Sequence, residues 1–227
     1  MARKTTLRHK RTSIRTMENM TELQQALLDV RKAQRLLVAF HQRVLPLIQK
    51  IGEDLDCNFD YWYPVNHGPA PKGNTNPFNR WYWDYSSLSD AIFFFLPEQT
   101  ESRNSAPVGA WALTIRLQTD TGISNSFGQK SRNWDALEIE PAPESSQTQL
   151  VVSAFRSTQD KNENWAWWNM FKNEKHQLKE GLTTSPHKEY DVLTQFIPIE
   201  NLMEEESVDM FVDDFKQKLI EHNYTSE

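Results

Sequence analysis

Apolar residues recur in steps of three and four between residues 21 and 55, which is the spacing of one face of an α-helix. Eight of the ten positions on this face are apolar. The ten positions are Leu23, Leu27, Val30, Gln34, Leu37, His41, Val44, Ile48, Ile51 and Leu55. The run Thr21-Glu22-Leu23-Gln24 has the form of a capping box, in which two side chains satisfy the first backbone donors of a helix. We therefore predict a long helix that begins at Thr21 and kinks or restarts near Pro46, which has no backbone N–H.

Two polar residues, Gln34 and His41, interrupt this apolar face and allow two interpretations. In a coiled coil with a second copy of the chain, polar seam residues fix the register and the number of helices. In a monomer, such residues are buried groups with a local hydrogen-bond partner. Leu28, Leu36 and Phe40 widen the apolar stripe beyond a narrow seam, which favours the monomer. A homo-oligomer formed through the helix at 21–55 remains the alternative.

The pattern after residue 56 alternates every two residues, as in β-strands. The clearest strand is residues 111–118, where Trp111, Leu113, Ile115 and Leu117 alternate with smaller or more polar residues. Further strands are predicted at residues 59–63, 81–85, 91–96, 134–139 and 149–155. A stretch rich in Pro, Gly and Asn at residues 64–79 predicts a long loop. Consecutive strands without intervening helices indicate an antiparallel sheet.

The C-terminal third predicts a helix at residues 163–179, a short strand at 192–197 and a final helix at 204–221. The fold class is therefore α+β, with the long N-terminal helix packed on a mainly antiparallel sheet of five to seven strands and with two C-terminal helices. We expect a single domain at residues 18–227, preceded by a basic disordered arm at residues 1–17.

Charge is distributed unevenly along the 227 residues, whose net charge is −6. The first sixteen residues contain no acid and six cations, namely Arg3, Lys4, Arg8, Lys10, Arg11 and Arg15. A short basic arm of this kind can follow a phosphate backbone, so nucleic acid is a candidate partner of residues 1–16. The alternatives are a disordered leader without a partner, or a start of translation at Met17 or Met20.

Several residue patterns are missing from the sequence. No run approaches the roughly 18 apolar residues of a membrane-spanning helix, and the start lacks the apolar run of a secretory signal. The single cysteine, Cys57, excludes an internal disulfide and fits a reducing compartment. We expect a cytoplasmic protein that does not enter the membrane. We also expect Cys57 to be a small buried residue at a strand start rather than a nucleophile.

The sequence lacks the familiar catalytic motifs. None of its seven glycines falls in G-x-G-x-x-G or G-x-x-x-x-G-K-[ST], and its six histidines form no H-E-x-x-H. It also has no G-x-S-x-G elbow of a serine hydrolase. We therefore expect no cofactor and no metal, and a protein that is more readily an interaction protein than an enzyme.

Acidic residues offer the one enzymatic alternative. Asp135, Glu138 and Glu140 lie on or beside a predicted strand, where carboxylates can bind Mg²⁺ for phosphodiester cleavage. No lysine follows two residues after any of them, in contrast to the usual arrangement in restriction nucleases. A second group, Glu206, Asp209 and Asp213, shares one side of the last helix and is read as a solvated face.

The tryptophans carry the functional hypothesis. Trp165 and Trp168 lie away from the apolar stripe of the helix at 163–179, so one face cannot bury them all. Trp81 and Trp83 share one face of the strand predicted at residues 81–85. Exposed tryptophans are enriched in binding hot spots. We therefore predict an inhibitor or adaptor that binds another protein through these four residues. The alternative is a nucleic-acid-binding protein or a metal-dependent nuclease.

Overall fold

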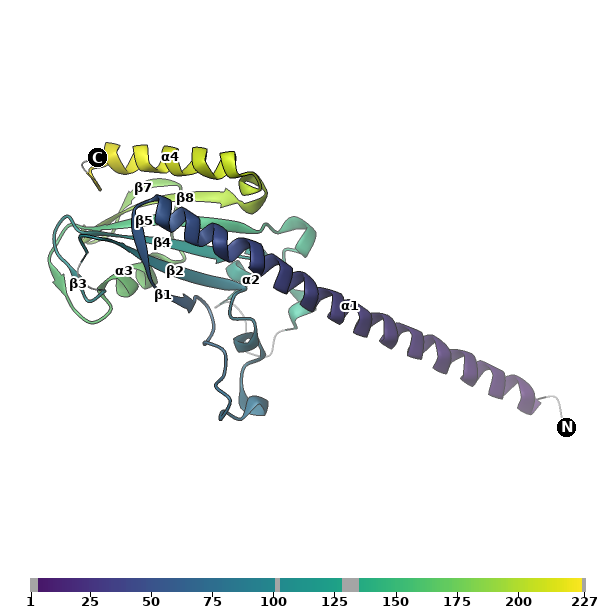
Figure 1. Ribbon diagram of the computed structural model, residues 1–227. Coiled ribbons are helices and arrows are strands. Elements are labelled where there is room, and N and C mark those ends of the chain that lie inside the picture. The colour runs from purple at the N-terminus through teal and green to yellow at the C-terminus, as the bar shows by residue number, and fades with distance from the viewer. Residues whose placement is uncertain (1–3, 101–102, 128–134, 226–227) are drawn as a thin grey trace. The chain divides into compact units, whose positions relative to one another are not determined.

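The computed structural model describes residues 4–100, 103–127 and 135–225, with side chains from residue 21 onward. The chain divides into two compact units, Met1–Ile48 and Gln49–Glu227. The first unit contains most of helix α1 (Lys4–Asp54), drawn in purple in Figure 1. The second unit contains the sheets and the remaining helices.

Helix α1 begins well before Thr21, so the predicted helix start was wrong. Residues 4–20 contain neither glycine nor proline, and the helical backbone bonds of α1 continue through the capping-box sequence. The helix also continues through Pro46 without ending there. The division of the chain at residue 17 stays a prediction, because the structure describes no side chain before residue 21.

The apolar face predicted for α1 is largely exposed in its N-terminal half. Leu23, Leu27 and Val30 each expose half or more of their surface, and Leu37 exposes 46%. Gln34 is exposed as well, so the expectation that it is a buried polar group was wrong. Further along, within the second unit, Ile51 is fully buried. Pairing of this exposed face with a second copy of the chain stays a prediction.

A six-stranded antiparallel sheet forms the centre of the second unit, in the order β1-β2-β4-β5-β8-β7. Its strands are β1 (Cys57–Pro64), β2 (Asp90–Pro97), β4 (Trp111–Gln118), β5 (Gln149–Ser157), β7 (Gly181–Thr184) and β8 (Tyr190–Pro198). A second sheet pairs β3 (Ser105–Ala106) with β6 (Lys161–Asn162). Together with the helices, these sheets confirm the predicted α+β class.

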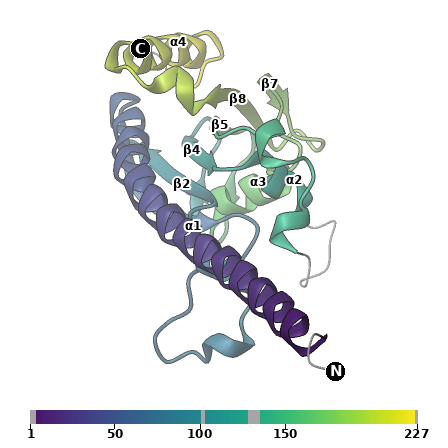
Figure 2. The ribbon, with the colours of Figure 1, turned by 90° about the vertical axis from the view of Figure 1, so that its right-hand side faces the viewer.

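Helices of the second unit cover both faces of the large sheet. Helix α4 (Glu205–Glu221) and helix α3 (Ala166–Glu174) lie on opposite sides of it in Figures 1 and 2. A short helix α2 (Thr121–Ser126) follows β4. The core under α3 brings Trp167 and Phe171 against Phe94 of β2 and Phe155 of β5. Because strand side chains alternate, the neighbours of Phe94, such as Phe93 and Phe95, face the opposite side.

Two predicted strands were wrong. Residues 82–85 form a 3-10 helix, because the carboxylate of Asp84 binds the backbone N–H of Gly68 and holds this segment in a loop. Ala136–Glu138 is a 3-10 helix as well, and Asp135 caps it by accepting a hydrogen bond from the N–H of Leu137. The Asp135 bond is local in the chain, and local side-chain bonds of this kind compete with strand pairing. Trp134, the first residue of this predicted strand, lies outside the described residues.

A buried ion pair joins the second and third strands of the sheet. Asp90 of β2 has no exposed surface, and both of its oxygens accept hydrogen bonds from the guanidinium of Arg116 of β4, each at 2.7 Å. Asn66 donates a further hydrogen bond of 2.6 Å to Asp90. Arg116 also donates to the carbonyl oxygen of Lys175, the C-cap residue of α3, at 2.8 Å. The pair therefore ties two strands, a loop and a helix end together.

We expect Asp90→Ala and Arg116→Ala each to destabilise the protein by about 3–5 kcal/mol, because each leaves one uncompensated buried charge. Thermal or urea unfolding measures this loss. A matched control is Lys218→Ala, which removes the exposed pair of Lys218 with Asp214 and should cost less than about 1 kcal/mol. Equal small losses in all three variants would show that the buried pair does not hold the sheet to α3.

Candidate functional site

Aromatic and arginine side chains gather where the edge strand β1 meets the start of α3. Among the strands that the structure describes, β1 pairs only with β2. We call this group the aromatic surface, and it consists of Tyr61, Tyr63, Arg103, Trp165 and Trp168. Tyr61 and Tyr63 come from β1, whereas Trp165 is the N-cap residue of α3 and Trp168 lies in its first turn.

Trp165 is the most exposed tryptophan of this surface, and 45% of it is accessible. Its backbone has a φ of 64°, in the left-handed region, at the N-cap of α3. A bulky residue in this region is an outlier that costs of order 1–3 kcal/mol. The surroundings hold the conformation, because the N–H of Trp165 donates to the side chain of Asn104 at 2.8 Å.

The indole of Trp165 is held from two sides. Its ring meets the ring of Tyr61 edge to face, with the centroids 5.2 Å apart. The guanidinium carbon of Arg103 lies 5.3 Å from the Trp165 ring centroid and 5.2 Å from that of Tyr61. Tyr61 in turn stacks on Phe94 of the core, with the centroids 4.4 Å apart. Tyr61 thus links the exposed Trp165 to Phe94 of the core through ring contacts.

Trp168 occupies the border between this surface and the core. It is half-buried, with its ring edge-on to Tyr63 at 5.2 Å and close to Phe94 and Phe171. Tyr63 exposes 40% of its surface. The prediction that α3 cannot bury all its tryptophans agrees with this geometry, in which Trp167 is buried and Trp165 is not.

The charges beneath the aromatic surface are paired. Arg103 donates a hydrogen bond of 2.7 Å to Asp60. Burial raises the pKa of Asp60, while the nearby Arg103 opposes that rise. Burial also raises the pKa of Tyr61, with the charge of Asp60 adding to the effect. One oxygen of Asp60 and the hydroxyl of Tyr61 are buried without a hydrogen-bond partner, which is uncommon in folded proteins.

Comparison with known proteins places the chain in a family. A family model described as PM0109 matches residues 20–224. The chain belongs to the PM0109 family. No curated protein and no solved structure matches the chain. Since the family description carries no chemistry, the function of this PM0109 family member has to be argued from its own geometry.

The other two predicted tryptophans of the PM0109 chain have different surroundings. Trp81 precedes the 3-10 helix of residues 82–85, and Trp83 lies within it. Both tryptophans are half-buried. Each packs edge-on against Phe127, at centroid distances of 5.6 and 5.4 Å. His67 contacts the same phenylalanine. These two tryptophans therefore line a loop cluster, while Trp165 and Trp168 belong to the aromatic surface.

The predicted carboxylate groups do not form a metal centre. Asp135, Glu138 and Glu140 are exposed, and Asp135 serves as the cap of a 3-10 helix. Within the described residues, no group of three or more His, Cys, Asp or Glu side chains could hold a metal ion. The same finding applies to the acids of α4, Glu206, Asp209 and Asp213. The nuclease hypothesis therefore has no assembled carboxylate site in the part of the chain that the structure describes.

The basic N-terminal residues of this PM0109 chain cannot be placed as side chains. Arg3 lies outside the described residues, and Lys4, Arg8, Lys10, Arg11 and Arg15 lie in the part of α1 for which no side chain is described. Contact of this arm with nucleic acid stays a prediction. Among the described residues, no helix has the length and apolar character needed to cross a membrane.

Sequence reasoning missed three residues of the aromatic surface. Tyr61 and Tyr63 alternate along a strand that was predicted, so their common face was readable from the pattern. Their contact with Trp165 and Trp168 could not be read from the pattern, because it joins positions about a hundred residues apart in the chain. No sequence pattern indicated Arg103, since it lies between two strands and outside any periodic segment.

Cys57 is buried and free, as the sequence predicted. Its thiol donates to the carbonyl oxygen of Leu55 at 3.3 Å. Burial, with a contribution from the charge of Asp56, raises the pKa of Cys57 to about 12. A thiol with this pKa is almost fully protonated at neutral pH and is a poor nucleophile.

We expect native Cys57 to resist modification by a chromogenic disulfide reagent such as DTNB at pH 8, because the thiolate fraction and the access are both low. One thiol should react after unfolding in guanidinium. The matched control Asn58→Cys places a thiol at the exposed neighbouring position and should react rapidly in the folded protein. Rapid reaction of the native wild-type chain would contradict the buried position of Cys57.

Proposed function

We propose that this chain is a non-enzymatic interaction protein, of the inhibitor or adaptor type, that binds another protein through the aromatic surface. The observation that carries this proposal is Trp165, a half-exposed tryptophan fixed in a left-handed backbone conformation. A glycine at this position would adopt the same backbone without strain. Stability alone therefore does not account for a tryptophan here, and strained positions cluster at functional sites.

The rigidity of the surface favours tight binding. The Trp165 side chain is restrained by Tyr61 and Arg103 before any partner arrives, so little side-chain entropy remains to be lost on association. Its residue types, Trp, Tyr and Arg, are those enriched among hot-spot residues. Trp168 supports the surface from the core side, where it contacts Tyr63 and Phe171.

The chemistry of the surface also indicates the kind of partner segment. Arg103 is already paired with Asp60, so the surface offers apolar and aromatic area rather than an unpaired charge. β1 is an edge strand of eight residues, and edge strands accept an extended segment of another chain through backbone hydrogen bonds. We propose that the partner lays an extended apolar segment along β1 and covers Trp165. Free, buried Cys57 supports a cytoplasmic setting for this encounter.

We expect Trp165→Ala to weaken partner binding by about 2 kcal/mol or more while lowering stability only by about 1 kcal/mol. The small stability loss follows from the exposure of Trp165, since few core contacts disappear. A pull-down of the full chain from native extract, followed by a melting curve on the same preparation, measures both effects.

Two control variants make this experiment decisive. Tyr82→Ala removes an aromatic side chain that is 79% exposed outside the aromatic surface, and it should retain the partner. Trp167→Ala removes a tryptophan that is 1% exposed, and it should cost about 3–5 kcal/mol. Nuclease treatment of the extract should not release the partner. Full retention of the partner by Trp165→Ala, or release by nuclease, would refute protein binding through this surface.

A further inference from the structure

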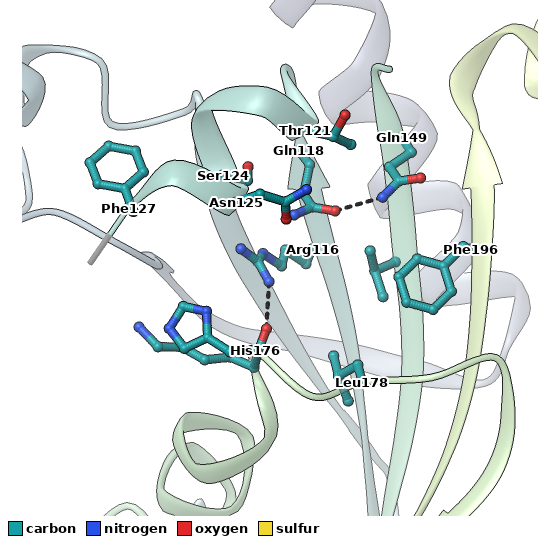
Figure 3. A pocket seen from close by; sticks show the side chains of 12 residues that line it. Arg116, Gln118, Thr121, Ser124, Asn125, Phe127, Gln149, His176, Leu178 and Phe196 are labelled. Atoms are coloured by element: carbon teal, nitrogen blue, oxygen red, sulfur yellow. Dashed lines mark hydrogen bonds between the residues drawn. The ribbon is translucent and has the colours of Figure 1, made fainter. Parts of the chain in front are cut away.

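A second site lies at the other end of α3, where a pocket of about 700 Å³ opens beside the ends of β4 and β5 (Figure 3). Its walls come from β4, α2, β5, β8 and the segment that follows α3. All of its lining residues are among those that the structure describes, and none belongs to the aromatic surface.

Basic side chains line one side of this pocket. Arg116, Lys175 and His176 contribute to its lining, and among the described residues no Asp or Glu does so. Arg116 lies between Asn125 and His176 in Figure 3. Hydrogen bonds to Asp90 and to the carbonyl oxygen of Lys175 hold its guanidinium in place. The amine of Lys175 is anchored by a hydrogen bond of 2.7 Å to the carbonyl of Val65.

The basic groups crowd one another. Burial lowers the pKa of Lys175, and the charge of Arg116 lowers it further. Burial likewise lowers the pKa of His176, and the charges of Lys175 and Arg116 add to that shift. Asp90 opposes both shifts but is already engaged with Arg116. An anion placed among these three groups would relieve their mutual repulsion.

Two glutamine side chains from neighbouring strands complete the site. Gln118 and Gln149 face the same space and are fixed by a mutual hydrogen bond of 2.7 Å.

We propose that this pocket binds a small organic anion, a carboxylate or phosphate ester whose anionic group lies against Lys175 and His176. Leu178 and Phe196, on the remaining wall, suit a short apolar or aromatic portion of the ligand. This binding site is independent of the aromatic surface and does not require the proposed function.

Calorimetric titration of the full chain with phenyl phosphate and with benzoate tests this proposal, with benzyl alcohol as the uncharged probe and ionic strength held constant. We expect both anions to bind and benzyl alcohol to bind at least about tenfold more weakly, which corresponds to about 1.4 kcal/mol. The bound anions should also raise the melting temperature as their concentration increases.

Two variants locate the binding. His176→Gln should weaken binding of phenyl phosphate about tenfold or more, whereas Lys179→Gln, an exposed position that does not line the pocket, should leave it unchanged. Absence of binding by both anions, or equal binding by the two variants, would overturn the proposal.

Discussion

The burial of one charge pair, Asp90 with Arg116, is the constraint on which the rest of the second unit depends. A guanidinium and a carboxylate in the interior of a sheet are tolerated only when nearly all their donors and acceptors are satisfied. Here the partners come from β2, β4, the loop at Asn66 and the carbonyl of Lys175. The position of α3 against the sheet is therefore fixed at its C-terminal end by specific hydrogen bonds as well as by apolar contact.

Helix α3 lies between the two proposed sites, and the Asp90–Arg116 pair holds its C-terminal end. Its nine residues bury Trp167, Met170 and Phe171 in the core. Trp165 caps its N-terminal end at the aromatic surface, and Lys175 caps its C-terminal end at the pocket. The packed face of this short helix and the hydrogen bond at its C-terminal end therefore position both sites.

The sequence predicted those features that local pattern determines. The two-residue alternation of large apolar side chains predicted Trp111–Gln118, although the structure buries both faces of this strand. The apolar stripe at helical spacing predicted α4, whose buried residues lie on one face. The strand predicted at residues 81–85 was wrong because alternating aromatic residues also suit a loop whose tryptophans pack on Phe127. The left-handed conformation of Trp165 and the pairing of Asp90 with Arg116 left no local signal, since both arise from contacts between distant segments.

The central claim is that a partner covers Trp165 and adds to the edge of β1. Hydrogen–deuterium exchange of the chain with and without its captured partner tests this most directly, because backbone amides report where the partner lies. The account predicts slower exchange in β1 (Cys57–Pro64) and around Trp165, with little change in α4. Protection confined to α1 or α4, with unchanged exchange in β1, would contradict it.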